Sequence, residues 1–247
     1  MKTLQNYITE KILINKNSKI GYIYHPKTRD ELEDIIKQKI ESEGNVCNLN
    51  DIDTSNITDM SKLFEYSEFN GNISNWDVSN VTDMTHMFIM SKFNNNISKW
   101  NVSNVTKMES MFFGSKFKGD ISKWDVSNVT SMVSMFCDSV FDGDISKWDV
   151  SKVKNMIGMF SHSKFNGNIS KWNVSNVKNM RYMFAYSKFN SDISNWDVFN
   201  VTDMEGMFSY SKFNSDISNW DVSNVTNSEN IFDNCPIEEK YKPKFKI

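Results

Sequence analysis

The sequence predicts a repeat solenoid, a stack of coils in which each coil supplies one short parallel strand and one helical or 3-10 turn. The first observation is a unit, FNGNISNWDVSNVTDMTHMFIMSK (residues 69–92), that returns with small changes down the chain. The second is a tryptophan that recurs every 24 residues without an insertion, at Trp76, Trp100, Trp124, Trp148, Trp172, Trp196 and Trp220. A fixed period of roughly 20–50 residues is typical of solenoids, whose units bury their apolar faces against one another. The third is that the pattern loosens at both ends, as expected where the apolar ends of a stack must be covered.

Each unit divides into two predicted segments. Its apolar positions are Phe69, Ile73, Trp76, Val78, Val81, Met84, Met87 and Phe88. The stretch 72–78 favours a strand, whereas the spacing within 81–88 favours one or two helical or 3-10 turns on the opposite side. Asn70-Gly71 indicates the turn back to the strand, with a left-handed backbone at its second position. The methionines fall almost entirely in two fixed columns, which indicates core packing rather than a cofactor site.

Residues 1–46 are predicted to form an N-terminal cap. Two β-like runs, 7–14 and 19–24, flank a turn and suggest a hairpin. An amphipathic helix is expected over 28–43, because Thr28 stands three residues before Glu31 and isoleucines recur on one face.

The solenoid itself is predicted over residues 47–232, as about eight coils with a degenerate first coil. Residues 233–247 are expected to form a C-terminal cap or tail. The whole chain is therefore predicted to be one elongated domain.

Composition excludes several classes of function. The net charge is −3 and the pI is about 5.7, so the chain lacks the basic surface that nucleic acids require. Three cysteines, Cys47, Cys137 and Cys235, lie far apart and outside any metal-binding spacing, so free thiols are expected. No apolar run is long enough for a membrane span or a signal-peptide core, and no lipidation cysteine lies near the start. These features predict a cytoplasmic protein.

The unit FNxDISxWDVSNVTxMxxMFxxSK resembles the repeats of the BspA-like leucine-rich-repeat surface proteins, in the variant abundant in mycoplasmas and known mainly as a domain of unknown function. The resemblance covers residues 49–232 and matches period and motif in every unit. It implies a leucine-rich-repeat-like solenoid with a binding or adhesion role and no catalysis. It also implies a cell-surface location, since many members are exported, and it supplies no catalytic residues.

Two polar columns have competing explanations. One column is led by Asp77 and the other by Asn72, and both columns contain aspartate and asparagine. Calcium coordination between coils is one explanation. Turn formation, in which the side chain accepts from nearby backbone amides, is the other and is preferred. The recurrent Asn-x-Ser/Thr triplets come with the repeat and are interpreted as structural.

No catalytic constellation is evident. The three histidines, His25, His86 and His162, lie in different contexts, and no motif ties a serine or cysteine to them. The sequence therefore predicts a protein that is not an enzyme and that has no catalytic, cofactor-binding or metal-binding residues.

Two sets of residues are candidates for binding a partner. The first is a lysine stripe on the predicted strand face: Lys99, Lys123, Lys147 and Lys171. The second is an aromatic and basic group nearer the C-terminus: Arg181, Tyr182, Tyr186 and Tyr210. The leading hypothesis is a non-enzymatic protein–protein interaction module that meets an acidic or polar partner on the sheet face. The alternatives are a surface adhesin that binds a host protein or glycan, and a Ser/Asn face that organises water or ice.

Overall fold

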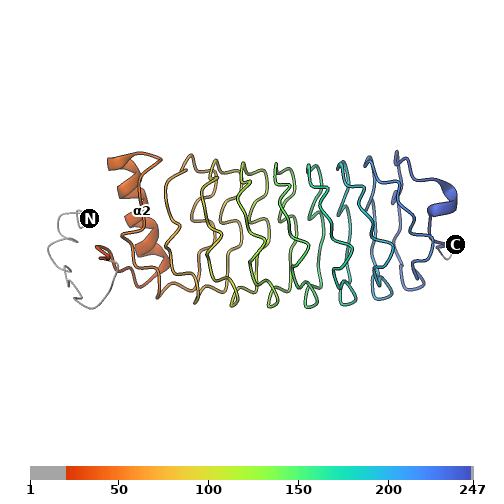
Figure 1. Ribbon diagram of the computed structural model, residues 1–247, viewed down its shortest axis with the longest axis horizontal. Helices are drawn as coiled ribbons and strands as arrows, with labels where there is room; N and C mark the ends of the chain where they lie inside the picture. Colours follow the sequence, from red (N-terminus) through yellow and green to blue (C-terminus); the bar gives the residue numbers. More distant parts are fainter. Residues whose placement is uncertain (1–20, 246–247) are drawn as a thin grey trace.

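The computed structural model describes residues 21–245, which form an elongated stack of coils (Figure 1). Helix α2 (Arg29–Glu43) lies at one end of this coil stack, and the short 3-10 helix η1 (Glu239–Tyr241) lies at the other. Each coil stacks on the coil 24 residues earlier, so the prediction of a repeat protein is confirmed.

Successive coils are joined by a ladder of backbone hydrogen bonds along the methionine-containing segment of the unit. At the start of this segment, isolated parallel bridges join residues that are 24 positions apart. The bridged residues are Asp59, Asp83, Lys107, Ser131, Asn155, Asn179, Asp203 and Asn227. Alternate amides beyond the bridge donate to the next coil: Met84 N to Lys107 O at 3.0 Å, and His86 N to Glu109 O at 2.9 Å. The ladder therefore lies on the side where the sequence predicted helical turns.

The predicted strand at 72–78 is wrong. Within residues 21–245 the only β-structure consists of isolated bridges, and Asn72 forms one of them, to Asn48. The rest of this stretch is turn and irregular chain, with Trp76 N donating to Ile73 O at 3.2 Å. A backbone that reverses every few residues offers no extended run for a ladder to follow.

The helical turns predicted at 81–88 are also wrong, because this segment is a series of overlapping β-turns. Met87 N donates to Met84 O and Ile89 N donates to His86 O, both at 3.2 Å. His86 has a φ of 59°, and a left-handed residue ends any right-handed helical run.

Left-handed residues recur at two positions of this segment in every coil. The first column is Lys62, His86, Ser110, Ser134, Gly158, Tyr182, Gly206 and Asn230. The second column is Tyr66, Met90, Gly114, Asp138, His162, Tyr186, Tyr210 and Asn234. The left-handed backbone predicted at position 71 is absent, because Gly71 is not among the residues with positive φ. A Cβ added at Gly71 would lie 2.0 Å from Cys47 O, so a glycine is needed here because the backbone of the neighbouring coil is too close for a side chain.

The core consists of stacked columns of apolar side chains. Neighbouring tryptophans stack in parallel, as Trp76 and Trp100 do with ring centroids 6.4 Å apart and planes within 2°. Each indole also donates to a backbone carbonyl of the preceding coil, for example Trp100 Nε1 to Ile73 O at 3.1 Å. The methionine columns, represented by Met84 and Met87, are fully buried, in agreement with their predicted core role.

Helix α2 covers the first coil. Its N-terminus is capped by the Thr28 side chain, which accepts from Glu31 N at 3.2 Å. The buried residues Leu32, Ile35 and Ile36 belong to the same apolar cluster as the coils. The hairpin predicted from the runs 7–14 and 19–24 falls almost wholly outside the described residues. Of these runs only residues 21–24 are described: Ile23 N donates to Asp51 O at 2.7 Å, and Tyr24 forms an isolated bridge to Ile52.

The last described residues pack against the final coil. Ile217 N donates to Tyr241 O at 3.0 Å, and Ile237 is buried. No helix within residues 21–245 is long and apolar enough to cross a membrane.

Candidate interaction surface

The lysine stripe lies on a row of turns rather than on a sheet. Lys99, for example, occupies the third position of the turn closed by Trp100 N and Ile97 O at 3.1 Å. All members are exposed, and in the described structure none forms a hydrogen bond or ion pair through its side chain: Lys99, Lys123, Lys147 and Lys171. Aspartates stand three residues before two of them, so the stripe carries charge of both signs.

An aromatic ladder lies on the second left-handed column. Tyr186 stacks on Tyr210 with ring centroids 4.8 Å apart and planes within 2°. His162 extends the stack by one coil, with its ring 4.4 Å from that of Tyr186 and inclined by 8°. The two tyrosines are 50% and 48% exposed, so the ladder lies at the molecular surface. We call His162, Tyr186 and Tyr210 the aromatic ladder.

A second cluster is centred on Glu205. The Tyr182 hydroxyl donates to the Glu205 carboxylate, Arg181 Nη2 lies 2.8 Å from it, and Asn227 Nδ2 donates to it at 3.1 Å. The hydrogen bonds from Tyr182 and then Asn227 hold the pKa of Glu205 below its ordinary value of 4.5. The same bond raises the pKa of Tyr182 above 10.0, so the phenol stays protonated at neutral pH. Arg181 also packs against the Tyr182 ring at 5.6 Å.

The structure brings the predicted aromatic and basic residues together in pairs. Tyr182 and Tyr186 occupy the two left-handed positions of the same coil. Arg181 and Tyr182 therefore precede the ladder residue Tyr186 by only four or five residues. No hydrogen bond, ion pair or ring contact within the described residues joins this group to the lysine stripe, which occupies a different turn of the coil.

Sequence reasoning missed three features of this surface. His162 and Glu205 became part of it only through contacts between coils. The third is a second lysine row, two residues beyond each ladder ring. Its side chains are exposed and form no ion pair or hydrogen bond in the described structure: Lys164, Lys188 and Lys212. The fixed period is the signal that could have identified it, because positions that differ by 24 are neighbours.

The side chains of the Asp and Asn columns stabilise turns by accepting hydrogen bonds from the backbone amide two residues later. Asp120 Oδ1 accepts from Ser122 N at 2.9 Å, and Asp125 Oδ1 accepts from Ser127 N at 3.0 Å. Equivalent bonds recur in the other coils, including those that carry asparagine, such as Asn96. No group of three or more His, Cys, Asp or Glu side chains among residues 21–245 is arranged to hold a metal ion.

Cys47 and Cys137 lack the properties of nucleophilic thiols. Burial raises the pKa of Cys137 to about 11 and raises that of Cys47 above its ordinary 9.0. Both are therefore thiols rather than thiolates at neutral pH, and the thiolate is the reactive form.

Comparison with protein families identifies a family whose model matches this chain twice. The model of the family described as "Mycoplasma protein of unknown function, DUF285" matches residues 32–141 and again residues 138–242. The two tandem matches agree with the internal repetition seen in the coils. Comparisons with curated proteins and with solved structures gave no match. Because the two matched segments span most of the chain, the protein belongs to this mycoplasma family of repeat proteins.

Proposed function

We propose that this protein is a non-enzymatic module that binds another protein through the aromatic ladder and its flanking charges. The observation that carries the proposal is the exposed stack of Tyr186 and Tyr210, whose backbone amides donate to carbonyl groups farther along the chain. Tyrosines combine a large apolar body with a polar tip, and they are enriched among the residues that dominate protein interfaces.

The geometry of the ladder favours a protein over a sugar at this surface. The rings stack face to face, so neighbouring rings cover most of the faces that a sugar ring would need. About half of each tyrosine remains exposed, and this amphipathic surface suits the side chains and backbone of a protein partner.

Charge indicates the chemistry of that partner. Lys164, Lys188 and Lys212 run beside the ladder without ion pairs among the described residues. Rows of unpaired positive charge favour an acidic partner and increase its association rate.

We also propose that the coil stack is related to the leucine-rich-repeat solenoids of BspA-like proteins, which the 24-residue period and the motif support.

The test compares partner capture by the full chain and by the double variant Tyr186→Asn, Tyr210→Asn, with bound proteins identified by mass spectrometry. Asparagine is chosen because Asn234 holds the same left-handed position in this structure. The matched control is Tyr66→Asn, a change at the same position of a coil outside the ladder. The captured protein is then purified and titrated against each variant.

The proposal expects the double variant to lose at least tenfold in affinity, about 1.4 kcal/mol, while Tyr66→Asn binds normally. Lys123→Glu with Lys147→Glu tests the lysine stripe in the same assay. If that pair abolishes binding and the tyrosine variant does not, the stripe rather than the ladder is the binding surface. Capture of no protein by the full chain would contradict the proposal.

A further inference from the structure

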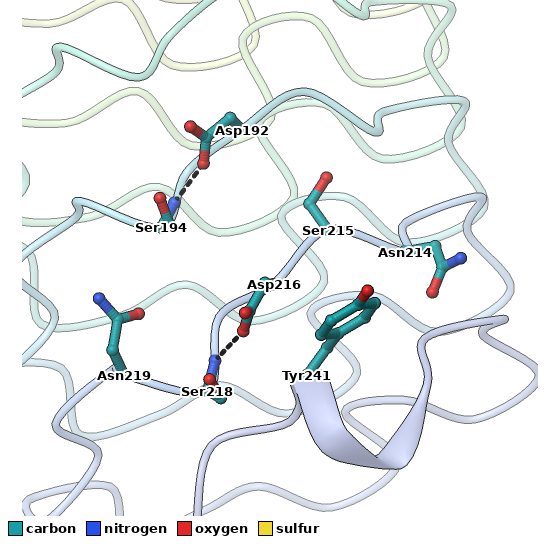
Figure 2. Close-up of a pocket in the computed structure, with 8 residues that line it drawn as sticks. All are labelled: Asp192, Ser194, Asn214, Ser215, Asp216, Ser218, Asn219 and Tyr241. Atoms are coloured by element: carbon teal, nitrogen blue, oxygen red, sulfur yellow. Dashed lines mark hydrogen bonds between the residues drawn. The ribbon is translucent and has the colours of Figure 1, made fainter.

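A pocket of about 610 Å³ lies at the C-terminal end of the coil stack (Figure 2). Its volume falls within the roughly 300–1,000 Å³ that is typical of small-molecule sites. The residues that line it are Asp192, Ser194, Asn214, Ser215, Asp216, Ser218, Asn219 and Tyr241. None of them belongs to the aromatic ladder.

The pocket exists because the chain turns back after the last coil. Glu238 N donates to Asn214 Oδ1 at 3.2 Å, and Ile217 N donates to Tyr241 O at 3.0 Å. These bonds fix η1 against the coil, and Tyr241 forms a wall of the pocket (Figure 2). In earlier coils the position of Asp216 is followed by another coil of the same type, without such a wall.

The lining consists almost entirely of hydrogen-bonding groups. Asp192 Oδ1 accepts from Ser194 N at 2.8 Å, and Asp216 Oδ1 accepts from Ser218 N at 2.9 Å (Figure 2). A carboxylate offers about four acceptor positions, so each retains capacity for a ligand. The serine hydroxyls and asparagine amides add groups that donate and accept. The backbone amides of Ser194 and Ser218 also hold the pKa of both aspartates below 3.8, so both are ionised at neutral pH.

Tyr241 supplies the only aromatic surface in the pocket. Lys240 Nζ lies 4.7 Å from the centre of its ring. The ring is partly exposed, which leaves apolar surface for a ligand. An aromatic face beside planar carboxylates and amides can contact both the C–H groups and the hydroxyl groups of a pyranose.

The lining also argues against other ligands. The residues that line the pocket include two carboxylates and no lysine, arginine or histidine. Lys240 lies next to Tyr241 and its charge acts on Asp216, so it offsets one of the two negative charges and leaves a net charge that disfavours an anion. The lining lacks the aliphatic side chains that dominate sites for apolar ligands. The two carboxylates belong to no group of three or more His, Cys, Asp or Glu side chains, among the residues that the structure describes, that could hold a metal ion.

We propose that this pocket binds an uncharged saccharide, with Tyr241 as the stacking surface and Asp192 and Asp216 as acceptors for sugar hydroxyls. The proposal is independent of the proposed protein-binding surface, because the two share no residue. Each can therefore fail without the other.

Saturation-transfer NMR on the full chain tests the proposal. The probes are methyl β-galactoside and methyl β-N-acetylglucosaminide, with N-acetylneuraminic acid as the anionic comparison and a short lysine peptide as the cationic one. The variants are Tyr241→Ala, Tyr241→Phe and Asp216→Asn. Asp144→Asn is the matched control, because it occupies the same position of a coil without the pocket.

At least one neutral sugar is expected to bind. Asp216→Asn should weaken it about tenfold, as expected for the loss of a hydrogen bond to a charged group, whereas Tyr241→Phe and Asp144→Asn should bind normally. Tyr241→Ala should abolish saturation transfer, and if that variant does not fold, Asp216→Asn decides. Absence of transfer to both neutral sugars, equal binding by Asp216→Asn, or stronger binding of N-acetylneuraminic acid or the lysine peptide would each overturn the proposal.

Discussion

The left-handed columns show how single residues determine the path of each coil. A left-handed conformation costs a residue with a side chain roughly 1–2 kcal/mol, yet most of these positions are not glycine. Backbone bonds between coils hold them in place, such as Tyr182 N to Glu205 O at 2.9 Å and Tyr186 N to Ser209 O at 2.8 Å. The side chains at these positions lie at the surface, which explains why their identity varies from coil to coil.

Gly206 and Gly158 provide a matched pair of substitutions at this scale. Both glycines have left-handed φ values, 58° and 59°, but a Cβ at Gly206 would lie 2.2 Å from Tyr182 Cε1, whereas at Gly158 the nearest atom is Ser134 Oγ at 3.3 Å. Gly158→Ala should therefore cost about 1–2 kcal/mol from backbone strain alone. Gly206→Ala should cost more and should displace the Tyr182 ring from Glu205. Urea unfolding of both variants measures the difference, and equal losses would contradict it.

At the scale of elements, one ion-pair cluster attaches α2 to the first coil. Lys39 is the buried member, with only 5% of its side chain exposed, and its Nζ lies 2.9 Å from Glu43 and 3.0 Å from Asp51. Burial opposes the charge of Lys39, but the hydrogen bonds that it donates to Glu43 and Asp51 outweigh burial and raise the pKa of Lys39 above 10.5. Asp51 belongs to the first coil, so this pair links two elements.

Lys39→Ala is expected to destabilise the protein by about 3 kcal/mol, because it leaves Asp51 without its partner in a mostly buried site. Lys37→Ala is the control. Lys37 pairs with Glu33 on the same helix at 2.8 Å but is 62% exposed, so its loss should cost less than about 0.5 kcal/mol. Thermal unfolding followed by circular dichroism compares the two. A loss for Lys39→Ala as small as that of the control would show that the cluster does not anchor α2.

At the scale of the whole molecule, small contributions are multiplied by repetition. Aspartates in the turn columns accept from the serine two residues later, and these bonds lower the pKa of several below the ordinary 3.8: Asp120, Asp144, Asp149, Asp192 and Asp216. A carboxyl with a lowered folded-state pKa stabilises the fold above its unfolded-state pKa and loses that contribution as the pH falls through the folded value. The stack should therefore lose stability in acid.

We expect the melting temperature, followed by tryptophan fluorescence, to fall as the pH decreases from about 5 to about 2. The triple variant Asp120→Asn, Asp144→Asn, Asp149→Asn should show a smaller decrease. Asparagine forms the same turns, as Asn96 and Asn101 show, but it does not titrate. If the melting temperature of the variant fell with pH as steeply as that of the unmodified protein, these turns would not be the cause of the acid sensitivity.

Four features follow from the sequence alone: the repeat, the buried columns, the N-terminal helix and the turn role of the Asp and Asn columns. Each of these follows from local rules: a period read along the chain, the Thr28 cap with its apolar face, and the tendency of Asp and Asn side chains to accept from the backbone amide two residues later. Because the period is free of insertions, it also fixed which residues become neighbours in adjacent coils.

The positions of the hydrogen bonds between coils depend on tertiary contacts. The hydrogen bonds run along the methionine segment and use left-handed residues, because the backbone conformation there is stabilised by groups 23–25 residues away rather than by local propensity. The same dependence on neighbouring coils stacks His162 on Tyr186 and places Glu205 under Arg181. It also brings Tyr241 over the last coil to form a pocket. Contacts between coils therefore shaped both surfaces that we propose to bind ligands.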